Sequence, residues 1–482
     1  MKYAGFILLA VLAIIVVLLL VAVINAIRIK AKPAPGKATL DFTKEEEKMY
    51  AEKLSRMVKI PTISMRGNTD LTEFYKLHKV IEEDFPLVHK HLEKTEIQGN
   101  LLYKWVGKDS SRAFLLMGHQ DVVPAEETDW KYDPFSGEIA DGAVHGRGAM
   151  DCKCTVLAEL SAVEELLSEN FVPECDVYLA FSANEEIFGG GADLIIDHLE
   201  KNNVNLLSVL DEGGTIMEKA FPGVACDTAA IGIVEKGNCN IKITAKGAGG
   251  HSSTPPKNTP IARLSAFVNE VETKKPFKKY MDVPVKQMFS SVAAYASFPM
   301  RLVLGNVWLF KPILVALLPS LSSFGEAFLS TTCAFTMCGG STAPNVIPDE
   351  AYVICNIRPS THQDADASIA VLEKIAEKYD LKVEPMNRRS ASKVTDPEGE
   401  AFSYLKQCIN EVRPDVCVTP YYMAGATDSR FYERVTDNCL RFCPVKMNPQ
   451  QLAAMHAANE NISTDNVAAG VKFYKYYIRN HK

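Results

Sequence analysis

The stretch FLLMGHQDVVP, from Phe114 to Pro124, decides the fold because it turns a buried strand into a chemical site within three residues. Its first four residues form an apolar run typical of a core strand in a parallel sheet, and Gly118 ends the run. His119 and Asp121 follow. Residues two apart in extended backbone project to the same side, so the imidazole and the carboxylate can meet. A metal-bound histidine is commonly held by an acid in this way.

The same pattern, an apolar run followed by acidic residues, occurs twice more along the chain. Residues 177–181 (VYLAF) precede the pair Glu185-Glu186, and residues 206–210 (LLSVL) precede Asp211. Open α/β sheets bind ligands outside the carboxyl ends of their strands, so these side chains can converge there. A further acid, Asp151, stands just before a segment whose apolar residues recur at helical spacing.

These residue types suit a two-metal hydrolytic site. Two adjacent glutamates alone are usually exposed to solvent at the protein surface. Solvent exposure does not explain why acids and a histidine follow three separate apolar strands. Zinc accepts imidazole and carboxylate oxygen, and two ions can share one carboxylate and one water. Glu185 and Glu186 are adjacent in extended backbone and point in different directions. One can therefore bind metal while the other takes a proton from the water.

The order of strands and helices predicts an α/β fold with two domains. Alternating strands and helices up to about residue 210 indicate a mainly parallel sheet. The following pattern, β-α-β-β-α-β, is typical of a ferredoxin-like α+β domain. We predict a transmembrane helix over 4–27, a linker over 28–40, a catalytic domain over 41–236 and 388–482, and an inserted small lid or dimerisation domain over 237–387 with an apolar insertion at 277–329.

The first segment is long enough to be a membrane anchor. Residues 4–27 carry no charge and would form a helix of about 36 Å, against a hydrocarbon core of about 30 Å. A cleaved signal peptide is the alternative, although Ile24-Asn25-Ala26 is a poor cleavage site. Basic residues are denser after the segment than before it, which favours a cytoplasmic catalytic body. Twelve cysteines without regular spacing fit a reducing compartment.

The overall charge bears on the kind of partner. The net charge is -7, and there is no basic patch rich in aromatic residues. Both features argue against a nucleic-acid partner.

Seven motifs together resemble a known enzyme family. They are GHQDVVPA (118–125), HGRGAMDCK (145–153), ANEE (183–186), LDEGG (210–214), GHSSTPP (250–256), GATDSR (425–430) and MHAANENI (455–462). The chain resembles the di-zinc metallopeptidase family of carboxypeptidase S, aminoacylase-1 and glutamate carboxypeptidase over nearly all residues after the linker. It is most similar to the branch of carboxypeptidase S and the N-fatty-acyl-amino-acid synthase/hydrolases.

The resemblance implies a set of metal ligands and their neighbours. Two zinc ions per chain would be bound by five residues, with Asp151 bridging them: His119, Asp151, Glu186, Asp211 and His456. Glu185 would be the general base and Asp121 the acid behind His119. The family takes either Asp or Glu at the position of Asp211, and Glu212 lies beside it. A cis peptide between Asp151 and Cys152 is also implied.

The resemblance further implies how substrate is bound. His251 would stabilise the oxyanion. In the family this histidine often reaches into the partner subunit's site, which allows a homodimer unless the apolar insertion occupies that surface. Asn345 and Arg358 would hold the substrate's terminal carboxylate, a task for which a guanidinium group can donate two parallel hydrogen bonds. Gly425 would let the main chain approach the same group.

We therefore expect a membrane-anchored hydrolase of amide bonds next to an amino acid with a free carboxylate: a carboxypeptidase, dipeptidase or N-acyl-amino-acid hydrolase. Its partners would be a small peptide or N-acyl amino acid and the lipid bilayer. An aminopeptidase of the same family, an inactive anchored binding protein and a secreted enzyme without the first segment remain alternatives. Apolar residues of the insertion, such as Trp308, Leu314 and Leu318, would pack internally, touch the bilayer or line a path for an acyl chain.

Overall fold

The central sheet is mixed, with parallel strands in its middle. The computed structural model describes residues 2–32, 41–126, 128–321 and 323–482. The strand order is β1 (Glu93–Ile97), β2 (Asn100–Trp105), β6 (Cys175–Ser182), β3 (Asp109–His119), β7 (Leu206–Asp211), β17 (Cys439–Arg441), β9 (Asp227–Glu235), β8 (Ile216–Met217) and β18 (Lys446–Met447), with β16 (Val416–Met423) paired to β9. β3 runs parallel to both β6 and β7. The predicted α/β fold class is confirmed.

Helices cover both faces of this sheet, which explains the continuous apolar run of β3. Phe114 and Leu116 face the core formed with α2 (Lys44–Val58), α5 (Lys153–Ser168) and α15 (Thr464–Asn480). Leu115 and Met117 face the opposite core, which includes α6 (Gly191–Lys201). A strand buried on both faces needs apolar residues at every position rather than at alternate ones.

A second sheet has its own hydrophobic core. Its strand order is β12 (Thr332–Gly339), β14 (Glu350–Arg358), β10 (Cys239–Lys246) and β15 (Lys382–Pro385), and every pairing is antiparallel. Helices α7 (Pro260–Lys274) and α12 (Ala365–Ala376) complete the predicted β-α-β-β-α-β order, and Phe267 and Leu372 are fully buried in this core. The domain limits at 237 and 387 stay a prediction.

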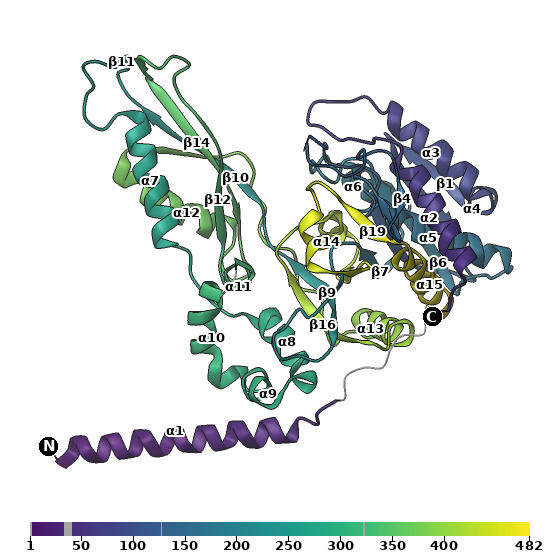
Figure 1. Ribbon diagram of the computed structural model, residues 1–482, viewed down its shortest axis with the longest axis horizontal. Coiled ribbons are helices and arrows are strands. Elements are labelled where there is room, and N and C mark those ends of the chain that lie inside the picture. Colours follow the sequence, from purple (N-terminus) through teal and green to yellow (C-terminus); the bar gives the residue numbers. More distant parts are fainter. Residues whose placement is uncertain (1, 33–40, 127, 322) are drawn as a thin grey trace.

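The tip of the second sheet lies far from the central sheet. There β11 (Gly250–His251) pairs with β13 (Val346–Ile347). In Figure 1 this ribbon is at the opposite end of the second sheet from β9 and β16 of the central sheet.

The apolar insertion consists of short helices that lie beside the first helix. They are α8 (Val283–Ser291), η1 (Ala293–Tyr295), α9 (Phe298–Leu304), α10 (Val307–Leu321) and α11 (Ser323–Leu329). In Figure 1, α9 lies close to the end of α1 (Lys2–Arg28) that adjoins the body, and α10 follows α9. Leu314, Val315 and Leu318 pack against the large core, so part of the insertion is internal.

Helix α1 has the properties of a membrane span. Within the described residues, Phe6–Arg28 is the one helical segment long and apolar enough to cross a membrane by itself, and an N-terminal signal sequence has the same properties. Helices α9 and α10 pass this test only when taken together, with a bend of 95° between them. Most of the predicted linker, residues 33–40, lies outside the described residues.

Candidate metal centre and active site

Asp151 lies between two histidines that are far apart in sequence. Its Oδ1 is 3.0 Å from Nε2 of His119, which ends β3, and its Oδ2 is 3.0 Å from Nε2 of His456. Nε2 of His456 is also 3.1 Å from Oε2 of Glu186. Each oxygen of one carboxylate thus faces a different imidazole, as a carboxylate shared by two metal ions would do.

The spacing of these atoms fits metal binding. Two ligands that are each about 2.0 to 2.1 Å from one tetrahedral zinc ion are roughly 3.3 Å apart, close to the separations observed here. Hydrogen bonds to Asp151 and Glu186 raise the pKa of His456 to about 10, so this position favours a positive charge. His456 has φ of 59°, in the left-handed region that histidine adopts more readily than most residues.

Two buried residues hold the loop before Asp151. The carboxylate of Glu460 accepts hydrogen bonds from the backbone N–H groups of Met150 (2.9 Å) and Asp151 (3.1 Å). It also pairs with the guanidinium of Arg147 at 2.9 Å. The peptide between Asp151 and Cys152 is cis, which confirms that prediction. Glu460 therefore ties the Asp151 loop to the segment that carries His456.

Asp121 links two of the strand ends. Its Oδ1 is 3.4 Å from Nδ1 of His119, and the same ring nitrogen is 2.9 Å from the Asp121 carbonyl oxygen. The carboxylate also accepts hydrogen bonds from the backbone N–H groups of Glu185 and Glu186, both at 3.1 Å, and from the Ser64 hydroxyl at 2.6 Å. Asp121 thus orients the two glutamates as well as the imidazole.

Glu185 is buried beside the candidate metal ligands His119, Asp151, Glu186 and His456, which form the ligand group. Burial raises the pKa of its carboxyl well above the usual range, His119 opposes this shift, and Asp428, Glu212 and Glu186 add to it. A carboxylate that is costly to keep charged readily accepts a proton.

The structure distinguishes Asp211 from its neighbour Glu212. Oδ1 of Asp211 accepts the Glu212 backbone N–H and Oδ2 accepts the Ser429 N–H, both at 2.8 Å. Burial raises the pKa of Glu212 well above its usual range, and Asp151 and Asp211 raise it further while His119 opposes them. The charges of the ligand group therefore act on the Glu212 carboxyl, whereas both carboxylate oxygens of Asp211 already accept hydrogen bonds from backbone N–H groups.

Arg358, at the end of β14, is a cation held near Glu185. Its Nε donates to Oδ1 of Asn356 at 2.9 Å. Burial lowers the pKa of Arg358, Arg430 adds to this effect, and Glu185 and Glu235 oppose it. The Arg358 guanidinium therefore interacts electrostatically with the Glu185 carboxylate.

The other predicted substrate residues do not join this group in one chain. His251 is exposed in β11, with Nδ1 2.8 Å from the Ser253 hydroxyl, and Asn345 accepts the Ser252 N–H at 3.1 Å through its carbonyl. β14 begins five residues after Asn345 and ends at Arg358, and its nine residues span about 26 Å when extended. Asn345 and Arg358 of one chain therefore lie at opposite ends of β14, and their role at the substrate carboxylate stays a prediction.

Gly425 lies in the exposed turn after β16. A Cβ added there would meet only Cε of Met423, at 3.9 Å, so its surroundings leave the main chain open to a ligand. The following residues are fixed by Glu235, which accepts hydrogen bonds from the Thr427 hydroxyl (2.9 Å) and from Nε of Arg441 (2.6 Å).

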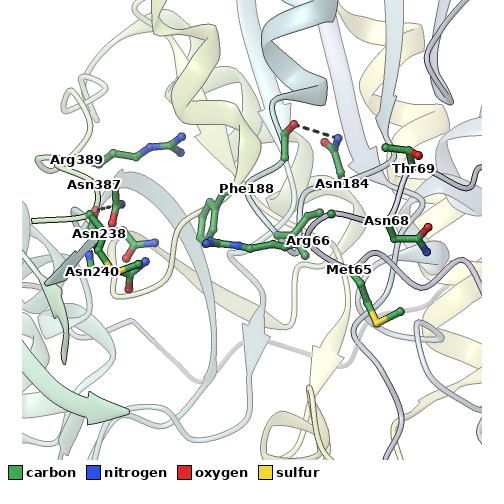
Figure 2. Close-up of a pocket in the computed structure, with 14 residues that line it drawn as sticks. Met65, Arg66, Asn68, Thr69, Asn184, Phe188, Asn238, Asn240, Asn387 and Arg389 are labelled. Atoms are coloured by element: carbon green, nitrogen blue, oxygen red, sulfur yellow. Dashed lines mark hydrogen bonds between the residues drawn. The ribbon is translucent and has the colours of Figure 1, made fainter. Parts of the chain in front are cut away.

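A polar pocket of about 590 Å³ adjoins the candidate site (Figure 2). Asn184, which precedes Glu185, lines one side with Phe188, and Asn238, Asn240 and Asn387 line the other. Asn356 donates to the side-chain oxygens of Asn238 (2.6 Å) and Asn240 (2.8 Å). Because Asn356 also accepts from Arg358, the pocket and the guanidinium belong to one hydrogen-bond network.

Comparison with known proteins gives the class of this chain. Residues 115–480 match the model of peptidase family M20/M25/M40, and the chain belongs to that family. It is a metal-dependent peptidase or amidohydrolase, and the resemblance carried by its motifs is confirmed.

The curated relatives span nearly the whole chain. A probable carboxypeptidase S-like 2 of Dictyostelium discoideum is 33% identical over 479 residues, which cover 96% of this chain and 92% of the relative. An N-fatty-acyl-amino acid synthase/hydrolase of Mus musculus is 33% identical over 450 residues, covering 91% and 89%. The crystal structure of an M20 family metallo-carboxypeptidase from Sulfolobus solfataricus shares the fold, with a TM-score of 0.65 and 20% identity over 89% of this chain and 98% of that one.

Proposed function

We propose that this chain is a membrane-anchored di-zinc hydrolase that releases an amino acid with a free α-carboxylate from a peptide or N-acyl amino acid. The observation that carries the proposal is the Asp151 carboxylate, whose two oxygens are each 3.0 Å from a different histidine. The names of the relatives, a carboxypeptidase S-like protein and an N-fatty-acyl-amino acid synthase/hydrolase, support the same substrate class.

The residues present divide the chemical work. His119, Asp151, Glu186, His456 and one further acid would hold two zinc ions, which supply Lewis acidity and lower the pKa of a bound water. Glu185 takes the proton of that water and delivers it to the leaving nitrogen. Asp121 keeps the two glutamates turned in different directions through their backbone N–H groups.

Arg358 is the proposed partner of the substrate's carboxylate. Replacing Arg358 by Ala should lower kcat/KM for N-acyl amino acids roughly 10- to 100-fold, because a charge-assisted hydrogen bond to the carboxylate is lost. The same variant should hardly change hydrolysis of the corresponding C-terminal amides. Steady-state kinetics on acid and amide pairs measures both effects.

A matched control is available three residues after the end of β15. Arg388 is exposed and pairs with Asp366 at 2.8 Å, so Arg388→Ala should leave both rates unchanged. Equal wild-type rates on the acid and its amide would exclude the role of Arg358 and favour an aminopeptidase.

Glu212 is the proposed fifth ligand in place of Asp211. We expect about two metal ions per purified chain, falling toward one in Glu212→Gln and staying near two in Asp211→Asn. The reason is that Asp211 already accepts two backbone N–H groups, whereas the buried Glu212 carboxyl interacts electrostatically with Asp151 and His119. Elemental analysis measures the ratio, and loss of metal from Asp211→Asn alone would return the ligand role to Asp211.

The position of His251 and Asn345 supports a homodimer. Both lie at the exposed tip of the second sheet, remote from the ligand group of their own chain. We propose that they complete the site of the partner subunit, His251 at the oxyanion and Asn345 at the substrate carboxylate.

The contacts of α1 favour a retained anchor over a cleaved segment. Asn306 is fully buried; its Oδ1 accepts from Nδ2 of Asn25 at 3.0 Å, and its Nδ2 donates to the Ala22 carbonyl at 2.9 Å. Removing α1 would take these two partners away and leave Asn306 with the Leu302 carbonyl and the Trp308 indole N–H.

A further inference from the structure

One face of α10 is exposed and, except for Ser320, apolar along its length. The side chains of this α10 face recur at helical spacing: Trp308, Pro312, Ile313, Ala316, Leu317 and Leu321. Trp308 is 48% exposed and Leu321 is 74% exposed. The one charged residue of α10, Lys311, has its Nζ 3.8 Å from the ring centroid of Tyr280. The α10 face therefore carries no charge.

The α10 face is continuous with the membrane-spanning candidate. Asn306, just before α10, binds Asn25 and Ala22 in the last two turns of α1. A Cβ on Gly305 would lie 2.4 Å from Cδ1 of Ile29, so the backbones approach closely here. Trp308 is next in line, with its Nε1 3.3 Å from Oδ1 of Asn306. The packing fixes α10 beside the end of α1 that adjoins the body.

The dimensions of α10 suit the membrane surface rather than a span. Its 15 residues are about 22 Å long, short of the roughly 30 Å of a hydrocarbon core, and α9 joins it at a bend of 95°. An uncharged apolar helix face of this length, with a tryptophan near the lipid headgroups, is typical of an interfacial helix.

We propose that the α10 face inserts into the lipid bilayer surface beside α1 and forms a second membrane contact. The inference rests on the proposed anchoring by α1 and names the surface that sets the orientation of the body. One spanning helix fixes the depth of the chain, and a second contact also fixes its tilt. Amphiphilic N-acyl amino acids held in the same bilayer are then presented to the enzyme at a constant orientation.

Trp308 allows a direct test in the full chain. The chain has three tryptophans, and the other two, Trp105 and Trp130, lie outside the insertion. Wild-type protein and Trp308→Phe would be reconstituted into phosphatidylcholine vesicles with or without brominated acyl chains. We expect brominated lipid to quench part of the wild-type emission and none of the Trp308→Phe emission. Equal quenching in both proteins would overturn the inference.

A functional measurement uses the centre of the α10 face. Ile313→Asp combined with Leu317→Asp should lower hydrolysis of a long-chain N-acyl amino acid in vesicles several-fold and leave a water-soluble short-chain substrate unchanged. Val172→Asp, at an exposed apolar residue of the body, is the control and should change neither rate.

The outcomes separate this inference from the proposed function. Unquenched Trp308 in a vesicle-bound, active enzyme would refute only the second contact. Crosslinking between copies through the α10 face, without quenching, would assign the face to a second copy of the chain. A vesicle-bound protein with quenched Trp308 that hydrolyses no amide would refute the proposed function alone.

Discussion

Glu185→Gln is expected to lower kcat roughly 10²- to 10⁴-fold while the metal content stays the same, because the amide keeps the shape of the side chain but cannot accept the proton. The expected result rests on the proposed role of Glu185 as the base; its side chain is buried, and its backbone N–H donates to Asp121. Steady-state kinetics and elemental analysis of the same preparation measure the two quantities.

The neighbouring glutamate provides the control. Oε2 of Glu186 is 3.1 Å from Nε2 of His456, so Glu186→Gln should lose metal together with activity. A Glu186→Gln enzyme that keeps both metals, beside a Glu185→Gln enzyme that loses one, would reverse the two roles.

Two inactive variants are expected to restore each other's activity when they are produced together. His251→Ala removes the contribution to the partner's site, and Glu185→Gln removes the base of its own site. In a mixed dimer one of the two sites has both residues, so co-expression should recover about a quarter of the wild-type activity. The measurement is the specific activity of the co-expressed pair against each variant alone.

A control distinguishes this result from simple mixing of partly active enzymes. Glu185→Gln co-expressed with Glu186→Gln leaves one change in each of the two sites of a mixed dimer, because both residues serve the site of their own chain, and should recover nothing beyond the separate variants. If the His251→Ala pair behaves in the same way, each chain completes its own site and the proposed exchange is wrong.

The strands and the polar residues that follow them could be predicted from the sequence because both are local features. The apolar run before His119 and the acids after β6 and β7 follow from the alternation of buried strand and polar turn. The β-α-β-β-α-β order of the second sheet was likewise readable from element spacing.

The features that sequence could not predict depend on direction and distance. Asp211 and Glu212 are adjacent, and only the folded chain shows that the Asp211 carboxylate accepts the backbone N–H groups of Glu212 and Ser429. The separation of Asn345 from Arg358 depends on the length and direction of β14. Glu460 is more than 300 residues along the chain from the loop that it holds. The only sign of its role in the sequence is that Glu460 belongs to the motif MHAANENI.

The tip of the second sheet lies far from the body of its own chain. If His251 at this tip serves another copy, as proposed, the catalytic rate depends on the concentration of enzyme copies. In the proposed homodimer, a site that needs His251 from another copy is complete only while two copies are paired, so dilution in detergent should lower the specific activity. As the proposed membrane anchor, helix α1 would confine the copies to a plane, which would raise their effective concentration without any new contact. The amount of membrane available to each chain would then control turnover.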